Sequence, residues 1–216
     1  LSSSSAASDV YKRQDFSPHV NRGVSYWESK NDKRILYTAG SLLFAINALT
    51  GKPVESFGAS GVTSLKAGLG VRAADLFVIA TSPGVVYNDL LIIGTRVSEN
   101  ADAAPGYVRA FNILTGKVEW VFHTIPKPGE YGYSTWPKNA YEQIGGANAW
   151  AGISLDEKRG VVYIPTGSAS FDFWGGNRLG ENLFANSIIA LDASTGKRIW
   201  HYQTVHHDIW DRDLPA

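Results

Sequence analysis

Three stretches of the sequence follow one pattern: LFAINALTGK at residues 43–52, VRAFNILTGK at 108–117 and IIALDASTGK at 188–197. Each sets a small Ala between large apolar residues, then opens a turn with Asn or Asp and closes it with Gly. An Asn or Asp side chain bonds readily to the backbone of a turn, and Gly accepts the positive φ that a tight turn requires. The pattern is therefore typical of a β-hairpin that occurs three times.

The second arm of each hairpin is expected to end on an aromatic residue. The second and third copies reach Trp120 and Trp200, whereas the first continues as PVESF over residues 53–57. We interpret the turns and the aromatics as packing between successive repeats, not as sites of chemistry.

Other short apolar runs between the hairpins are predicted to be strands. They lie at residues 35–38, 85–87, 90–94, 153–155 and 161–165. With these runs each repeat holds about four strands, which is the content of one propeller blade. The sequence therefore predicts an all-β fold, a partial β-propeller of about three blades within residues 15–216, whereas closed propellers have about four to eight blades.

The two ends of the chain carry separate expectations. Residues 1–14 are rich in Ser and Ala and then basic, and we interpret them as a disordered or non-native tail outside the fold. The chain has no Met, and it stops at Ala216 directly after a dense polar cluster. We therefore expect a fragment of a longer protein.

Composition excludes several classes of function. Lys and Arg number 20 against 20 Asp and Glu, so the formal net charge is zero, which argues against nucleic acid as a partner. There is no Cys, so disulfides, Cys-ligated zinc and thiol catalysis are excluded.

Polar segments between the strands are the candidates for function, because propellers place function on their loops. Arg22, within residues 19–27, could face an anionic ligand, although alone a surface Arg is the simpler interpretation. Arg96, Glu99 and Asn100 follow a strand directly and could offer a cation together with oxygen ligands for Ca²⁺, or form a solvated strand end. Trp150, between small residues, is either core or a stacking platform for a planar cofactor.

The densest polar segment is HHDIWDRD at residues 206–213. A carboxylate held there could act as a general base. The His pair suggests a transition metal, but neighbouring His side chains rarely bind one ion together. Hydrogen bonding in support of other residues is the alternative that we favour for them.

Taken together, these segments resemble the quinoproteins, the dehydrogenases that depend on pyrroloquinoline quinone (PQQ) and form an eight-bladed propeller, most closely the glucose and polyol branch. The resemblance runs from about Phe16 to Ala216. It implies that Arg22, Thr81, Arg96 and Trp150 bind PQQ. It also implies a catalytic base at Asp211.

The same resemblance implies a Ca²⁺ site with Glu99 and Asn100 as ligands. Methanol-oxidising relatives have an Asn ligand after Gly-Thr-Gly, and Ser168 stands at that place here.

The function that the resemblance implies is oxidation of a sugar or polyol hydroxyl. Hydride would pass to PQQ, Ca²⁺ would act as a Lewis acid, and electrons would leave to ubiquinone or a cytochrome c, in the periplasm or at its membrane. The alternatives are a quinoprotein alcohol dehydrogenase and a non-catalytic propeller scaffold of the outer-membrane assembly type. The fragment alone is expected to be inactive.

Overall fold

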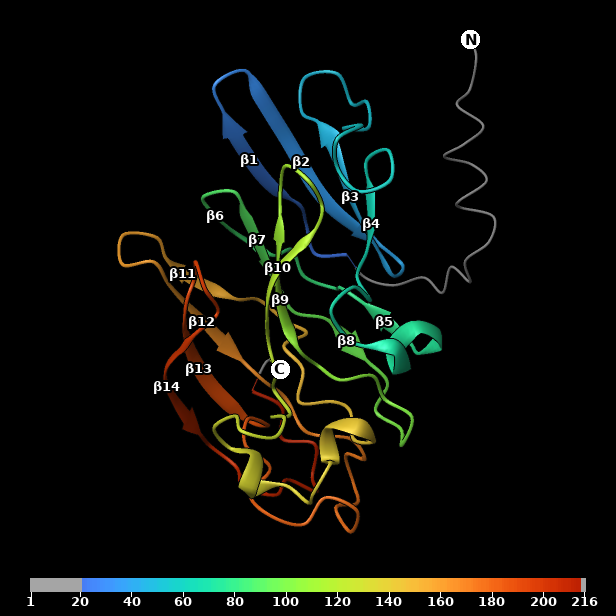
Figure 1. The fold of residues 1–216 in the computed structure, drawn as a ribbon, viewed down its shortest axis with the longest axis vertical. Coiled ribbons are helices and arrows are strands. Elements are labelled where there is room, and N and C mark those ends of the chain that lie inside the picture. Colours follow the sequence, from blue (N-terminus) through green and yellow to red (C-terminus); the bar gives the residue numbers. More distant parts are fainter. Residues whose placement is uncertain (1–20, 215–216) are drawn as a thin grey trace.

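The computed structural model describes residues 21–214 and contains three four-stranded antiparallel sheets, which follow one another through the molecule (Figure 1). The first sheet contains β1 (Ser25–Ser29), β2 (Asp32–Ala39), β3 (Leu42–Asn47) and β4 (Val62–Ser64). The second contains β6 (Val85–Tyr87), β7 (Leu90–Ile93), β9 (Val108–Asn112) and β10 (Val118–Phe122). The third contains β11 (Ser154–Asp156), β12 (Val161–Pro165), β13 (Ser187–Asp192) and β14 (Arg198–Gln203). We call these sheets blades 1, 2 and 3.

The predicted all-β fold of about three blades is thereby confirmed. Helical structure within residues 21–214 is limited to three short 3₁₀ segments, at Val71–Asp75, Tyr133–Thr135 and Ala140–Glu142. No helix in this range is long and apolar enough to cross a lipid bilayer. The predicted tail at residues 1–14 lies outside the described residues.

The hairpin turns form as the sequence indicates. The side-chain oxygen of Asn112 accepts hydrogen bonds from the backbone N–H groups of Leu114 (2.9 Å) and Thr115 (3.0 Å), and Asn47 makes the same pair of contacts in blade 1. In blade 3, Asp192 accepts from Thr195 at 2.9 Å. The central Ala of each repeat is fully buried, so the strand before each turn packs into the core.

Blade 1 departs from the other two after its turn. In blades 2 and 3 the residues after the turn form the fourth strand, β10 and β14. In blade 1 only an isolated bridge between Ile46 and Pro53 follows, and the fourth strand is β4. Proline has no N–H to donate to a strand ladder, which accounts for the difference at Pro53.

Each blade contacts the turn of the next one. The indole of Trp120 on β10 is buried and donates from Nε1 to the carbonyl of Ala193 (3.2 Å) in the turn of blade 3. At the equivalent place in blade 1, Phe57 is fully buried and the N–H of Gly58 donates to Thr115 (2.9 Å) in the turn of blade 2. The predicted role of the turns and aromatics in blade packing is confirmed at both of these interfaces.

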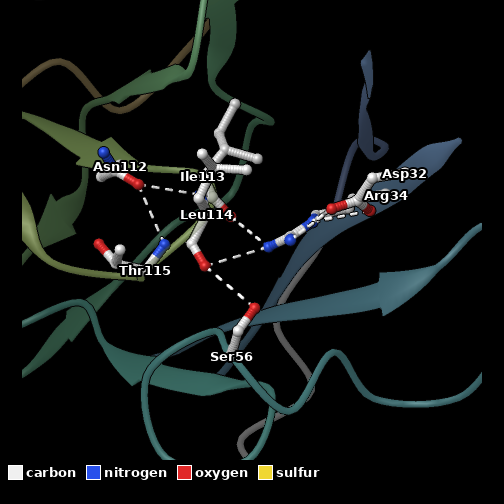
Figure 2. A network of polar contacts seen from close by, with 7 residues as sticks. All are labelled: Asp32, Arg34, Ser56, Asn112, Ile113, Leu114 and Thr115. Atoms are coloured by element: carbon white, nitrogen blue, oxygen red, sulfur yellow. Dashed lines mark hydrogen bonds and ion pairs between the residues drawn. The ribbon is translucent and has the colours of Figure 1, made fainter. Parts of the chain in front are cut away.

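A buried arginine adds a second contact between blades 1 and 2 (Figure 2). Arg34 on β2 pairs with Asp32 at 2.6 Å and donates from Nη1 to the carbonyls of Ile113 (2.8 Å) and Leu114 (3.2 Å). Ser56 donates to the same Leu114 carbonyl at 3.2 Å. A buried guanidinium is tolerated only when it is paired and hydrogen-bonded, so this network fixes blade 1 against the second turn.

A two-stranded sheet outside the blades joins the connections that precede and follow β6 and β7. It pairs β5 (Val78–Ile79) with β8 (Arg96–Val97), with Ile79 opposite Arg96. So short a pairing could not be predicted, because two-residue strands leave no periodic pattern in a sequence. The consequence of this pairing is that residues 78–79 and 96–97 lie side by side.

The blade contacts lead to a prediction for the turn glycines. Gly51 and Gly196 both have φ of +69°, but a Cβ on Gly51 would meet nothing within 4 Å, whereas one on Gly196 would lie 2.5 Å from the indole of Trp120. We expect Gly51→Ala to lower the free energy of unfolding by about 1–2 kcal/mol, the cost of a left-handed residue with a side chain. Gly196→Ala should lower it by a further 1–3 kcal/mol or so because of the overpacking.

Urea unfolding of both variants and of the parent chain measures these losses. Equal losses for the two variants would contradict the proposed packing of Trp120 on the third turn.

Candidate active site

One cavity of about 380 Å³ gathers loop residues from all three blades, and its size lies in the range of small-molecule sites. Seven of the eight predicted site residues line it: Arg22, Thr81, Arg96, Glu99, Trp150, Ser168 and Asp211. The eighth, Asn100, does not. The remaining lining residues are Val97, Ser98, Asn148, Ser170, Asp172 and Asp213.

Three of the predicted cofactor-binding residues are joined by hydrogen bonds. The backbone N–H of Arg22 donates to the carbonyl of Thr81 (2.9 Å), and the Thr81 hydroxyl donates to the carbonyl of Trp150 (2.7 Å). The Arg22 guanidinium lies 5.8 Å from the centre of the Trp150 ring. The indole therefore forms a wall of the cavity beside a cation, in place of entering the core.

A buried arginine supports the segment that carries Trp150 through a chain of hydrogen bonds. Arg109 on β9 is fully buried and donates to the hydroxyl of Thr95 (3.1 Å) and to the carbonyl of Leu65. The carbonyl of Thr95 in turn accepts from the side chain of Asn148 at 2.9 Å. Burial lowers the pKa of Arg109 to about 9, which still leaves it charged at neutral pH.

Asp213 holds two walls of the cavity together. One carboxylate oxygen accepts from the indole N–H of Trp150 (2.7 Å), and the other accepts from the backbone N–H of Ser168 (2.6 Å). The sequence singled out Asp213 only as part of a polar cluster, because its partners lie 63 and 45 residues away. Nothing local in the sequence indicates that contact.

Asp211, the predicted base, is exposed at the cavity and has a positive φ of 54°. Partial desolvation, followed by the negative charges of Asp213, Glu99 and Asp208, raises the pKa of its carboxyl. A carboxylate with a raised pKa is a stronger proton acceptor, as a general base requires. Strained backbone is often found at functional positions, and Asp211 combines it with access to the cavity.

Asp208 has a structural role in the same segment. It is 2% exposed, and its carboxylate accepts from the hydroxyl of Ser168 (2.5 Å), the side chain of Asn186 (3.1 Å) and the backbone N–H groups of Trp210 (3.0 Å) and Arg212 (2.6 Å). Burial acts to raise its pKa, yet the hydrogen bonds, led by that from Ser168, outweigh burial and hold the pKa below its ordinary value.

Neither His206 nor His207 lines the cavity. His207 contacts the carbonyl of Gly180 at 3.0 Å, and His206 lies 3.7 Å from the carboxylate of Glu181. Neither of these contacts reaches a cavity residue, so the supporting role that the sequence favours for the His pair stays a prediction.

The predicted calcium ligands assemble only in part. Glu99 lines the cavity and lies 3.7 Å from the guanidinium of Arg96. The hydroxyl of Ser168 is already bound to Asp208, and Asn100 lies outside the lining. Across residues 21–214 no three His, Asp or Glu side chains gather closely enough to hold a metal ion by themselves.

Asp172 also lines the cavity and was not among the predicted site residues. It is 5% exposed, and no hydrogen bond to its carboxylate is found among the described residues. Burial raises its pKa to about 7, with further contributions from the charges of Asp211, Glu99 and Asp213. The only signal in the sequence was its place four residues after Ser168.

The raised pKa of Asp172 predicts a dependence of stability on pH. An unfolded chain ionises an Asp near pH ~4, whereas the folded chain keeps this proton up to about pH 7. The folded chain therefore binds more protons in that interval, and its stability falls as the pH rises from 4 to 7. Asp172→Asn removes the titrating group, so the fall in the free energy of unfolding should be smaller in the variant.

Urea unfolding at pH 5 and pH 8 tests this expectation. Asp192→Asn is the matched control, because Asn already occupies the equivalent turn position at residues 47 and 112. An equal fall in the free energy of unfolding between pH 5 and pH 8 in the parent and in Asp172→Asn would contradict the raised pKa.

Comparison with known proteins agrees with this architecture. A family model described as PQQ: Glucose/ethanol/alcohol dehydrogenase, beta-propeller domain, matches residues 5–216. The quinate/shikimate dehydrogenase (quinone) of Acinetobacter baylyi is 38% identical over 182 residues, which cover 82% of this chain and 22% of that protein. The quinoprotein glucose dehydrogenase of Escherichia coli K12 is 36% identical over 215 residues, which cover 92% and 26%.

Among solved structures, the quinohemoprotein alcohol dehydrogenase ADHIIG of Pseudomonas putida HK5 matches with a TM-score of 0.73 and 32% identity, over 89% of this chain and 28% of that one. The chain thus spans only 22% to 28% of the length of these three relatives. The match to the family model nevertheless extends over nearly the whole sequence. The chain belongs to the family formed by the β-propeller domains of the PQQ-dependent glucose, ethanol and alcohol dehydrogenases.

Proposed function

We propose that this chain supplies the cofactor-facing part of a PQQ-dependent dehydrogenase that oxidises a hydroxyl group of a sugar or polyol. The observation that supports the proposal most directly is the convergence of Arg22, Trp150 and Asp211 on one cavity. They provide a cation, a flat aromatic face and a proton acceptor. The relatives named above are dehydrogenases for quinate or shikimate, glucose and alcohols.

The residues fit an anionic planar cofactor. PQQ carries carboxylates, which Arg22 and Arg96 can bind by charge-assisted hydrogen bonds. The indole of Trp150 offers a face for the rings. The Thr81 hydroxyl donates to the backbone carbonyl of Trp150, and the Asp213 carboxylate accepts from the indole N–H. The aromatic wall is thus positioned before any ligand arrives, which lowers the cost of binding.

Proton transfer is the step that this chain itself performs. Oxidation of an alcohol removes one proton from oxygen and one hydride equivalent from carbon; the quinone, when bound, supplies the two-electron acceptor. Asp211 takes the hydroxyl proton on its carboxylate. Its raised pKa and exposure to the cavity suit that role.

A calcium ion is a finer part of the proposal. Glu99 lines the cavity and would supply an oxygen to it, since hard cations prefer carboxylate ligands. Ser168 and Asn100 receive less support from their contacts. Ubiquinone or a cytochrome c remains the proposed electron acceptor, and the periplasm the proposed location.

The role of Asp211 is tested in the full-length enzyme with Asp211→Asn. We expect PQQ binding to persist and kcat on glucose, quinate, polyols and short alcohols to fall by roughly 10²- to 10⁴-fold, the usual contribution of a general base. Calorimetry with PQQ and steady-state kinetics measure the two quantities, with Asp192→Asn as the control. Retained turnover would remove Asp211 from this role.

The cofactor assignment is tested with Arg22→Gln. Loss of one charged hydrogen-bonding partner costs about 1.5–3 kcal/mol, so the affinity for PQQ should fall by roughly 10- to 100-fold. Arg159→Gln is the matched control, because Arg159 is exposed and bonds only within its own turn, to Asp156 at 2.6 Å. If the parent enzyme shows no affinity for PQQ, a non-catalytic scaffold becomes the better interpretation.

A further inference from the structure

The carboxylate of Asp172 contrasts with its neighbour Asp208. Both residues are buried, at 5% and 2% exposed. Asp208 receives hydrogen bonds from four groups, whereas no donor reaches Asp172 from the rest of the described chain. Polar groups that are largely buried in proteins are nearly always hydrogen-bonded. The carboxylate oxygens of Asp172 are not closed off inside the protein but open onto the cavity that the residue lines, so a ligand in the cavity can supply the donor that the described chain does not.

The two residues that precede Asp172 are held by hydrogen bonds. The fully buried Arg178 donates to the carbonyl of Phe171 (2.9 Å) and also to the carbonyl of Asp208 (2.5 Å). Ser170 donates through its hydroxyl to the carbonyl of Ser98 (3.2 Å) and through its N–H to that of Gly145 (3.0 Å). Asp172 therefore lies at the cavity wall because its neighbours hold it there, and the open carboxylate is a built feature of the site.

Asp172 lines the same cavity as the proposed base. Of the charges that act on its carboxyl, that of Asp211 has the greatest effect. A substrate whose reacting hydroxyl meets Asp211 can therefore bring a second hydroxyl to Asp172 within that cavity. A carboxylate accepts hydrogen bonds from such hydroxyl groups and has none to offer when ionised.

We propose that Asp172 is a substrate-recognition residue that accepts a hydrogen bond from a second hydroxyl of the substrate. This inference rests on the proposed function. The site accordingly takes vicinal diols, such as polyols and sugars, in preference to monohydric alcohols. A site built to bond a hydroxyl rejects the analogue without it strongly, because its own polar group is then left buried and unpaired. A cation is the less favoured occupant, since no three acidic or His side chains of residues 21–214 gather around one point.

The test compares 1,2-propanediol with 1-propanol on the full-length, PQQ-loaded enzyme. In the parent we expect kcat/KM for the diol to exceed that for the monohydric alcohol by roughly 100-fold or more. Asp172→Leu removes the acceptor at similar size and should lower this ratio at least tenfold. Asp172→Asn retains one acceptor oxygen and should give an intermediate ratio, while Asp192→Asn should keep the parental ratio.

Several results would overturn the proposal. One is a diol-to-monohydric-alcohol ratio of kcat/KM that is unchanged in both Asp172 variants. That result would leave the proposed dehydrogenase activity itself unaffected. Another is a loss of Ca²⁺ binding by Asp172→Leu in calorimetric titration, which would make the residue a cation ligand.

If the parent binds PQQ but oxidises neither alcohol, calorimetric titration with glycerol decides the role of Asp172; the proposed function itself fails only if glucose, quinate and other polyols are not oxidised either. A tenfold weaker affinity in Asp172→Leu than in the parent would support recognition. Equal affinities would overturn it.

Discussion

Each blade meets the turn of the next at a point where no side chain can be added. The indole of Trp120 lies where a Cβ on Gly196 would be, and the backbone of Gly58 takes the same position against the turn of blade 2. Because the Asn and Asp side chains fix the shape of these turns, the turns of blades 2 and 3 present their glycines to the blade before them. The relative placement of the blades follows from this contact, and the cavity between their loops follows from that placement.

Four carboxylates at or next to the cavity fall into three groups by their burial and hydrogen bonding. Asp208 is buried and saturated with hydrogen bonds, and Asp213 is committed to Trp150 and Ser168. Asp172 and Asp211 face the cavity with raised pKa values. Negative charges held this close destabilise one another in water-poor surroundings. The two committed carboxylates give the site its rigidity, and the two open ones are left for chemistry.

Much of the fold follows from local sequence patterns. The three hairpins and most of the central strands could be predicted because alternating apolar residues, an Asx turn and a glycine all act within ten residues of one another. The altered fourth strand of blade 1 was visible only as Pro53 in place of a strand residue. The small sheet of β5 and β8 could not be predicted, since two-residue strands carry no periodicity.

The site was predictable where a family resemblance supplied it, as for Arg22, Trp150 and Asp211. Asp172 and Asp213 were missed as site residues for a physical reason. Their roles depend on partners, or on the lack of partners, brought near by the packing of separate blades. The hydrogen bond between Trp150 and Asp213 joins residues 63 positions apart, so the sequence around either residue does not indicate it. The absence of a donor to a buried carboxylate is likewise a property of the folded chain alone.

The six residues from Asp208 to Asp213 have a further consequence for how such a site can evolve. Asp208 anchors one end, Asp213 anchors the other, and Asp211 lies between them in a left-handed conformation. An insertion or deletion between the anchors would displace proton acceptor and aromatic wall together, so this segment should tolerate no change of length. Trp210 is 69% exposed among the described residues, so a point substitution there would leave both anchors in place, whereas a change of length would not.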